Sequence, residues 1–288
     1  MIEWDAELID AIARRRSVIV IGSGVSRNAT NAAGVRPETW EGFLSRESQE
    51  LGCAVLVKGL LGRRDYLTAC QIVSREMGDQ IFRKAIKAEY IDKQYSHAKI
   101  HELIYALDSS IVLSPNFDVI YETYASAVSK GSLLVRMHHD ADIAGYISGG
   151  PNRVFVKTHG SASGPGSLIF TYREYAEART KFRVFYELLK SLVMTHHFLF
   201  LGCGIDDPDI RGLFEDVHFA HGQLPSHFMT LPAGQNADQV LKIISENMGL
   251  NFIQYDSKDG HLELTESLNE LVTSVDALRN EISNTRNW

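Results

Sequence analysis

The chain has neither an excess of positive charge nor a long apolar run. Its 29 Lys and Arg stand against 36 Asp and Glu, so the formal net charge is -7 at pH 7. This balance indicates no general affinity for nucleic acid. No apolar run approaches the roughly 20 residues of a membrane-spanning helix, and the N-terminal stretch MIEWDAELIDAIARRR lacks the apolar centre of a signal peptide. We therefore expect a cytoplasmic protein that acts away from membranes.

Cysteines and metal-binding patterns are also scarce. The three cysteines, Cys53, Cys70 and Cys203, are far apart and form no CxxC pair. Their odd number argues against a disulfide framework, and Cys203 lies in an apolar segment where a buried thiol is expected. The histidines show neither an HxH nor an HExxH spacing. We therefore expect neither a zinc site nor cysteine catalysis.

Short apolar segments alternate with segments of helical periodicity. The expected strands are residues 17–21, 109–114, 132–139, 153–160, 196–204, 227–232 and 251–255. This alternation predicts an α/β fold with a Rossmann-like, doubly wound parallel sheet. Residues 38–107 are mostly helical in pattern, with breaks at Gly52, Gly59, Gly62 and Gly78. We expect one domain over residues 1–288, with these helices inserted after the first strand.

Polar residues follow several of these strands at their carboxyl ends. Doubly wound sheets bind ligands outside those ends, where the strand order reverses. The segments concerned are 22–27, Asn116 with Asp118, His159 with Gly160, and 202–206. We expect these four loops, which are distant in sequence, to converge on one crevice.

The first of these loops, in the stretch SVIVIGSGVSRN, is typical of the start of a nucleotide site. Gly22 and Gly24 let the backbone approach a pyrophosphate, although a strand-to-helix turn needs glycine for its shape alone. The dehydrogenase fingerprint requires a third glycine where this chain has Arg27, and a Walker A loop requires a GKS or GKT that is absent. Hydride transfer and phosphoryl transfer are both disfavoured.

The next two loops supply an amide, a carboxylate and an imidazole. Asp118 in PNFD suits an N-cap of the following helix, while Asn116 can bond a sugar hydroxyl or hold a water. The spacing alone leaves the structural and the functional interpretation of this pair equally open. His159 lies between a strand end and a glycine, and an imidazole is the side chain best suited to accept a proton near neutral pH. His159 is therefore the candidate general base.

Other polar and aromatic groups receive structural interpretations. The acidic run 204–209 could bind Mg²⁺, but helix capping by Asp206, Asp207 and Asp209 is the simpler account. The aromatic residues expected in the core are Tyr172, Tyr175, Phe182, Phe185 and Tyr186.

Five motifs, in this order, resemble those of the sirtuin-like family, the silent-information-regulator fold. They are GSGVS at 22–26, GVRPETW at 34–40, SPNFD at 114–118, KTHGS at 157–161 followed by SLIFTYREY at 167–175, and FLFLGCGIDDPDI at 198–210. They are similar to the family's GAGxS, its Gly-hydrophobic-Pro-x-aromatic segment in lengthened form, its T-x-N-x-D motif, its HG segment and its late glycine turn. The DDPDI ending resembles that of bacterial sirtuin-like defence proteins, and the resemblance covers nearly the whole chain.

The resemblance implies that NAD binds in an extended pose and that the bond between nicotinamide and ribose is broken. Asn116 would then contact the nicotinamide ribose or order a water, and His159 would be the general base. Asp118 is expected to orient the Asn116 loop. The residues assigned to NAD binding are Gly22, Ser23 and Gly24 at the diphosphate, Gly202 and Gly204 near the adenosine, and Ser26, Arg27 and Asp118.

One departure from the family concerns zinc. Protein-deacylating sirtuins carry a structural zinc on two CxxC pairs, and this chain has no such pair. Deacylation is thus disfavoured, and water is the expected acceptor, with nicotinamide and ADP-ribose as products. These features are similar to those of the sirtuin-like NAD hydrolases of bacterial anti-phage systems, which deplete NAD when activated.

Two other functions stay open. The chain could be a sensor or assembly subunit that binds NAD or ADP-ribose without turnover, or a zinc-free protein deacylase or ADP-ribosyltransferase. The expected domain leaves little room for a separate sensor. We therefore expect regulation through homo-oligomerisation or a separately encoded partner, such as an ATPase of the DNA-translocase type.

Overall fold

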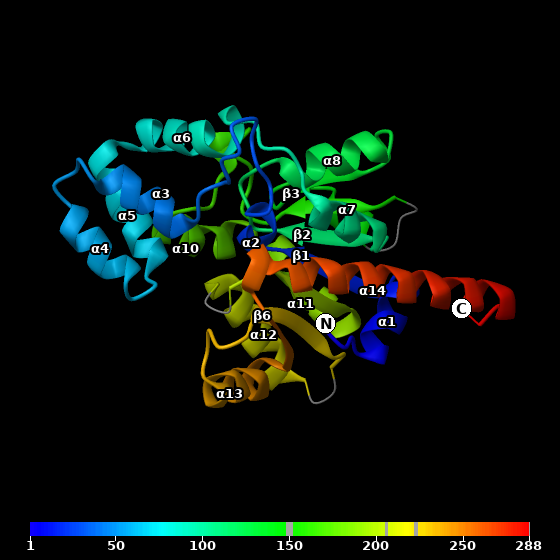
Figure 1. Ribbon diagram of the computed structural model, residues 1–288. Coiled ribbons are helices and arrows are strands. Elements are labelled where there is room, and N and C mark those ends of the chain that lie inside the picture. Colours follow the sequence, from blue (N-terminus) through cyan, green and yellow to red (C-terminus); the bar gives the residue numbers. More distant parts are fainter. Residues whose placement is uncertain (148–151, 205–206, 222–223, 288) are drawn as a thin grey trace.

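A seven-stranded sheet lies at the centre of the computed structural model, which describes residues 1–147, 152–204, 207–221 and 224–287 (Figure 1). The strands are β1 (Ser17–Ile21), β2 (Ile111–Ser114), β3 (Leu134–Met137), β4 (Val154–Lys157), β5 (His197–Leu201), β6 (His227–Pro232) and β7 (Leu250–Tyr255). Their order in space is β3-β4-β2-β1-β5-β6-β7, and each neighbouring pair is parallel. This confirms the predicted α/β fold with a Rossmann-like sheet.

Strand β1 lies in the middle of the sheet because both of its faces are apolar. All five of its residues are buried. Ile19 and Ile21 belong to the hydrophobic core on one face, and Val18 and Val20 belong to the core on the other, as the alternation of side chains along a strand requires. A strand of this kind needs helices on both faces of its sheet.

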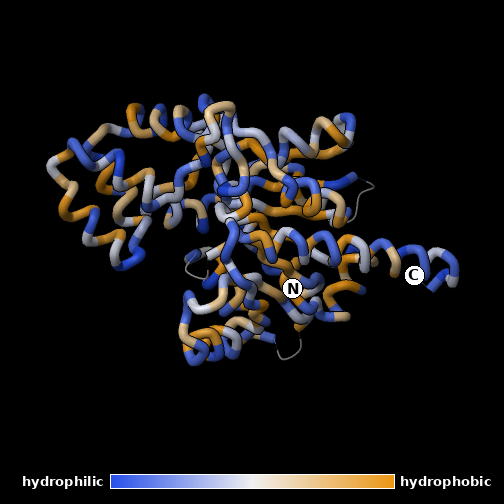
Figure 2. The backbone as a smooth tube through the Cα atoms, in the orientation of Figure 1, coloured by the Kyte–Doolittle hydropathy of each residue, from blue (hydrophilic) through white to orange (hydrophobic). Residues whose placement is uncertain are grey.

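Helices cover both faces. One face carries α1 (Ala6–Ala13), α7 (Lys99–Ala106), α8 (Ile120–Val128) and α14 (Lys258–Thr285). The other carries α9 (Ile143–Ile147), α11 (Arg183–Thr195), α12 (Pro208–Ala220) and α13 (Asp238–Met248). Apolar residues gather along the sheet in Figure 2, whereas the C-terminal end of α14 is mostly hydrophilic. Across the described ranges, no helix combines the length and apolar character that a membrane crossing requires.

A further group of helices, which we call the helical lobe, follows β1 and the short helix α2 (Ser23–Ser26). It consists of α3 (Trp40–Ser48), α4 (Ala54–Leu61), α5 (Tyr66–Met77), α6 (Asp79–Lys87) and the π-helix η1 (Ala88–Asp92). These helices share a hydrophobic cluster of their own, and in Figure 1 the lobe lies at the end of the molecule opposite the C-terminus. Helix α7 packs instead against α14 on the main sheet.

The helix break expected at Gly59 is wrong. Helix α4 runs through this glycine, and its buried face is formed by Val57, Leu60 and Leu61. Burying these side chains outweighs the roughly 1 kcal/mol that a glycine costs inside a helix. Gly62 does mark the end of α4, and Gly78 separates α5 from α6.

The segment after β4 forms part of the functional region. The strand ends at Lys157, short of the expected 160, so that His159 lies in a loop. A 3-10 turn, η2 (Pro165–Ser167), and helix α10 (Tyr172–Lys181) follow. Helix α10 then packs against α5 of the helical lobe and against α11 beside the sheet.

Candidate functional site

A cleft of about 770 Å³ lies at the carboxyl ends of the strands, between the sheet and the helical lobe. This volume lies within the range of pockets that hold small molecules and cofactors. All four loops expected to converge contribute to its lining. Nine of the ten residues expected from the sequence line it, namely Gly22, Ser23, Gly24, Ser26, Asn116, Asp118, His159, Gly202 and Gly204.

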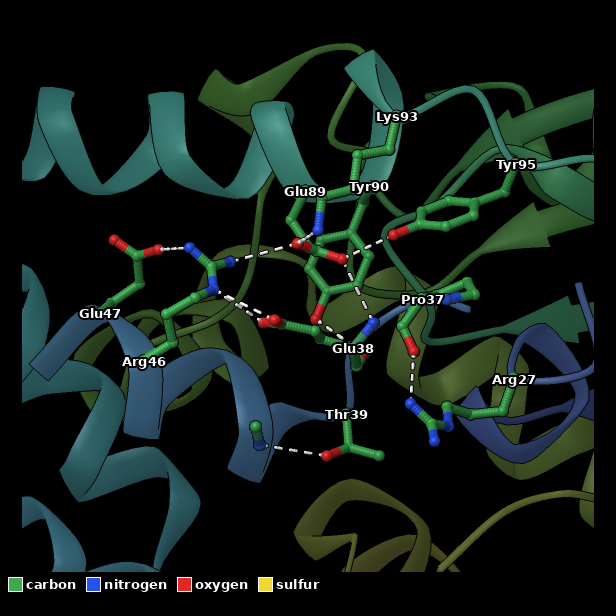
Figure 3. A network of polar contacts seen from close by, with 11 residues as sticks. Arg27, Pro37, Glu38, Thr39, Arg46, Glu47, Glu89, Tyr90, Lys93 and Tyr95 are labelled. Atoms are coloured by element: carbon green, nitrogen blue, oxygen red, sulfur yellow. Dashed lines mark hydrogen bonds and ion pairs between the residues drawn. The ribbon is translucent and has the colours of Figure 1, made fainter. Parts of the chain in front are cut away.

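The tenth residue, Arg27, holds one wall of the cleft instead of lining it. This wall is the segment 37–41, which leads into α3. Arg27 is exposed, and its Nη1 donates to the carbonyl of Pro37 at 2.7 Å (Figure 3). From the other side, the hydroxyl of Tyr90 donates to the carbonyl of Glu38 at 3.3 Å. Two side chains that are far apart in sequence therefore hold the backbone of the wall.

A buried carboxylate, Glu89, anchors the same wall (Figure 3). It accepts from the backbone N–H of Glu38 at 3.2 Å, from the hydroxyl of Tyr95 at 2.7 Å and from Nη2 of Arg46 at 3.1 Å, and it also pairs with Lys93. Desolvation alone would raise the pKa of Glu89, but the bonds from Lys93, Tyr95 and Glu38 outweigh it and lower the pKa. Sequence reasoning missed Glu89, because no local pattern distinguishes it from a surface glutamate.

The glycine turns after β1 and β5 pack directly against each other. The N–H of Gly24 donates to the carbonyl of Gly202 at 2.9 Å. A Cβ on Gly22 would lie 2.3 Å from the same oxygen, and Gly202 itself has a φ of +62°. These positions therefore need glycine for the contact between two neighbouring strand ends. The same lack of side chains leaves the backbone open toward the cleft.

A hydrogen-bond chain links three of the expected residues. Ser26 Oγ donates to Asp118 Oδ2 at 2.7 Å and accepts from Asn116 Nδ2 at 2.9 Å. A carboxylate only accepts, so the hydroxyl must donate to it, and the amide must present its N–H group to the hydroxyl. The chain therefore holds Asn116 with Nδ2 toward Ser26 and Oδ1 turned away from it.

Asp118 also bonds the start of the next helix. Its Oδ1 accepts from the N–H of Ile120 at the start of α8 at 3.0 Å. Beneath it, Lys157 is buried, donates to the carbonyl of Asp118 and lies 3.2 Å from the carboxylate of Glu122. Burial raises the pKa of the Glu122 carboxyl despite this partner. The N-cap of α8 is Val119, so the expectation that Asp118 occupies this position is wrong by one residue; Asp118 bonds the first N–H group of α8 from the preceding position, and its second oxygen orients Asn116 through Ser26.

His159 is buried and lines the same cleft. Its Nδ1 lies 3.0 Å from the phenolic oxygen of Tyr175, and the two ring centroids are 4.8 Å apart. Tyr175 is buried as expected but also lines the cleft, while Tyr172 is 60% exposed and lines it as well, so the prediction of a core position for Tyr172 is wrong. The capping box of Thr171 and Glu174 was the sequence signal that could have corrected this prediction, because it marks Tyr172 as the first residue of α10.

The far part of the cleft was not predicted. It lies beyond the second glycine turn, where polar side chains come from the loop after β6, the end of β7 and the kinked start of α14, namely Gln235, Asn236, Tyr255 and His261. The hydroxyl of Tyr255 lies 2.9 Å from Nδ1 of His261. Three successive residues, 259–261, have positive φ angles and form the kink that turns His261 back toward the strand end. The cleft is therefore longer than the predicted residues alone indicated.

Asp207, from the acidic run expected at 204–209, caps a helix. Asp207 Oδ1 accepts from the N–H of Ile210 in the first turn of α12 at 3.1 Å, which confirms its capping role. Asp206 and the side chain of Asp209 lie outside the described residues. Within the described part of the chain, no group of three or more His, Cys, Asp and Glu side chains is arranged to hold a metal ion.

Comparison with known proteins agrees with this geometry. The family described as SIR2-like domain matches residues 110–253, half of the chain, from the start of β2 to β7. Defense-associated sirtuin 2 of Bacillus subtilis is 23% identical over 221 residues, which cover 75% of this chain and 21% of that protein. The chain therefore spans about a fifth of the length of this curated relative. The matched range contains Asn116, His159 and the second glycine turn, and the chain belongs to the SIR2-like family.

Proposed function

We propose that the chain is an NAD glycohydrolase, which cleaves the bond between nicotinamide and ribose and releases nicotinamide and ADP-ribose. The observation that carries this proposal is the presence of an oriented amide, Asn116, and a buried imidazole, His159, in one cleft with the two glycine turns. A protein that only binds NAD needs neither group. Membership of the SIR2-like family supports NAD as the ligand.

The substrate occupies the cleft in an extended pose. Its diphosphate lies against Gly22, Ser23 and Gly24, where an anion can approach the backbone at the start of α2. The adenosine lies toward Gly202 and Gly204 and the polar part of the cleft beyond them. This arrangement directs the nicotinamide ribose toward Asn116 and His159. Arg27 is not part of the proposed contact set, because its guanidinium is engaged with Pro37.

Cleavage proceeds through a sugar cation at C1′. The pyridinium nitrogen takes the bonding electron pair and leaves as neutral nicotinamide, so the departure needs no general acid. A water attacks C1′, and His159 accepts the proton that the water loses. Asn116 Oδ1 accepts a hydrogen bond from a ribose hydroxyl or from this water, and the chain through Ser26 to Asp118 keeps that oxygen in place.

Water is the acceptor that we propose, because the sequence lacks the paired CxxC motifs of zinc-bearing protein deacylases. No zinc takes part in the proposed reaction. The name of the relative, Defense-associated sirtuin 2, supports a biological setting in defence. We propose that the protein depletes NAD in the bacterial cytoplasm during anti-phage defence. Its activity is held in check until it forms a homo-oligomer or meets a separately encoded partner, such as a DNA-translocase-type ATPase.

Release of nicotinamide from NAD by the purified protein tests the proposal. Asn116→Ala and His159→Ala should each lower the rate at least ~100-fold, while His221→Ala, at an exposed histidine at the end of α12, should leave it unchanged. The assay is run in each oligomeric state and with the natural partner. Recovery of intact NAD from a tight complex in all of these conditions would show a sensor, and an NAD-dependent product on an acylated peptide would show a deacylase.

A further inference from the structure

Tyr175 and His159 form a buried pair whose function the proposed reaction leaves open. The phenolic oxygen lies 3.0 Å from Nδ1 of the imidazole, and both side chains are only 3% exposed. We propose that Tyr175 is the positioning residue of His159: it accepts a hydrogen bond from Nδ1–H and thereby keeps Nε2 as the nitrogen that takes the proton. This inference rests on the proposed role of His159 as general base.

The direction of the hydrogen bond follows from the proposed role of His159 as general base. Such a ring carries one proton, on either Nδ1 or Nε2. If the tyrosine donated to Nδ1, the proton would sit on Nε2, and that nitrogen could not accept another from water. A ring that accepts at Nε2 must therefore donate from Nδ1, and a phenolic oxygen is able to accept that bond. A hydroxyl that accepts from Nδ1–H thus stabilises the tautomer that a general base needs.

The loop of His159 is built to bring the two residues together. Gly160 has a φ of +82°, and a Cβ there would lie 2.3 Å from the carbonyl oxygen of Ser167. The N–H of Ile169 donates to the carbonyl of His159 at 2.9 Å. The chain therefore folds back on itself within ten residues, and α10 begins close to the imidazole. The glycine is required by this close approach of two backbone segments.

The start of α10 is held from the other side by the helical lobe. Arg83 of α6 pairs with the carboxylate of Glu174. The same carboxylate accepts from the N–H of Thr171 at 2.8 Å as part of the capping box. Gln71 of α5 accepts from the N–H of Arg173 at 3.1 Å. The lobe therefore fixes the position of Tyr175 relative to the imidazole of His159. A shift of the lobe would move α10, and with it the hydroxyl that bonds the imidazole.

A double-mutant cycle separates positioning from general structural support. Tyr175→Phe retains the ring and removes only the oxygen. We expect kcat for nicotinamide release to fall about tenfold while the Kd for NAD stays within twofold. In the His159→Ala background the same substitution should cause no further loss, because the hydroxyl then has no imidazole to orient. Losses that multiply in the double variant, or an unchanged kcat in the single variant, would overturn the proposal.

The control for this cycle is Tyr121→Phe. Tyr121 is a buried tyrosine that packs on Phe155 in the core beneath α1, α7, α8 and α14, and it does not line the cleft. Removal of the hydroxyl in Tyr121→Phe should change neither kcat for nicotinamide release nor the Kd for NAD. A fall in kcat equal to that of Tyr175→Phe would mean that any buried hydroxyl has the same effect, and the positioning role would be lost.

Nitrogen chemical shifts of the imidazole provide a readout that needs no turnover. In protein labelled with ¹⁵N-histidine, the signal of His159 is identified by its loss in His159→Ala. We expect the neutral wild-type ring to be protonated at Nδ1 and Tyr175→Phe to shift it toward protonation at Nε2. A wild-type ring protonated at Nε2 contradicts the proposal. A wild type that releases no nicotinamide yet shows a tyrosine-dependent Nδ1 tautomer supports the pairing and refutes the proposed hydrolysis.

Discussion

Ser26 Oγ lies 2.7 Å from Asp118 Oδ2, although 92 residues separate the two in the sequence. This contact fixes the donor and the acceptor in each hydrogen bond of the series Asn116–Ser26–Asp118. The carboxylate can only accept, so the Ser26 hydroxyl donates to it and accepts from the amide of Asn116. The other oxygen of Asp118 accepts from the N–H group of Ile120, the first residue of α8. One carboxylate therefore anchors a helix and orients the amide that faces the proposed substrate.

Ser26→Ala should interrupt this chain without creating a clash. Asn116 then loses the acceptor of its N–H group and can rotate, so we expect the rate of nicotinamide release to fall about tenfold, the equivalent of one hydrogen bond. Ser48→Ala removes a buried hydroxyl that bonds only within α3 and should leave the rate unchanged. Equal rates for wild type and Ser26→Ala would show that the amide is held by other contacts.

Gly22→Ala and Gly59→Ala should have opposite effects on stability. The new methyl group at 22 meets the carbonyl of Gly202, whereas the one at 59 enters open space on α4. We expect the free energy of unfolding to fall by about 2 kcal/mol for the first and to rise by about 0.5–1 kcal/mol for the second. Denaturant unfolding measures both. A neutral Gly22→Ala would mean that the two turns can move apart.

Glu89→Gln should weaken the wall of the cleft in a pH-dependent way. The loss of charge-assisted bonds from Arg46, Lys93 and Tyr95 is expected to cost about 2 kcal/mol at neutral pH. Because the folded-state pKa of Glu89 is lowered, its contribution is present above the unfolded value of about 4.3 and is lost as the pH falls through the lowered value.

Unfolding free energies of wild type and Glu89→Gln from neutral pH to about pH 3 check this expectation. The difference in unfolding free energy between wild type and Glu89→Gln should become smaller as the pH falls. Glu76→Gln, at an exposed position on α5, serves as the control and should follow wild type throughout. A gap that stays constant across this range would show that the ionised form of Glu89 is not what stabilises the wall.

Lys157 and Glu122 should show strong coupling. Lys157→Met leaves the carboxylate of Glu122, whose side chain is only 12% exposed, without its charged partner, and we expect a loss of about 3 kcal/mol in the free energy of unfolding. In Lys157→Met/Glu122→Leu the uncompensated charge is gone, so the double variant should be more stable than the single one. A double variant as unstable as the sum of the two singles would contradict the expected coupling.

Much of the fold could be predicted because its signals are local. Residues 18–21 are apolar and alternate between the two faces of the sheet, and the later strands alternate with helical periodicity, which is enough to indicate a parallel sheet covered on both sides. The convergence of four loops follows from the same reasoning, since the carboxyl ends of parallel strands meet at one edge. Nine of ten expected residues line the cleft for this reason.

The roles of individual polar residues depended on tertiary contacts. Arg27 follows a glycine turn, as a phosphate ligand would, yet it bonds Pro37. Tyr175 has the spacing of a core residue, yet its oxygen meets His159.

The sequence by itself determined which loops share the cleft and which amide and imidazole enter it, because strand ends and glycine turns are encoded by neighbouring residues. Only the tertiary structure decided what each polar atom bonds. A hydrogen bond requires its two atoms to approach within about 3 Å. The partners that matter are far apart in the chain: the packing of helices brings Glu89 to Arg46, and the pairing of β1 with β2 brings Ser26 to Asp118.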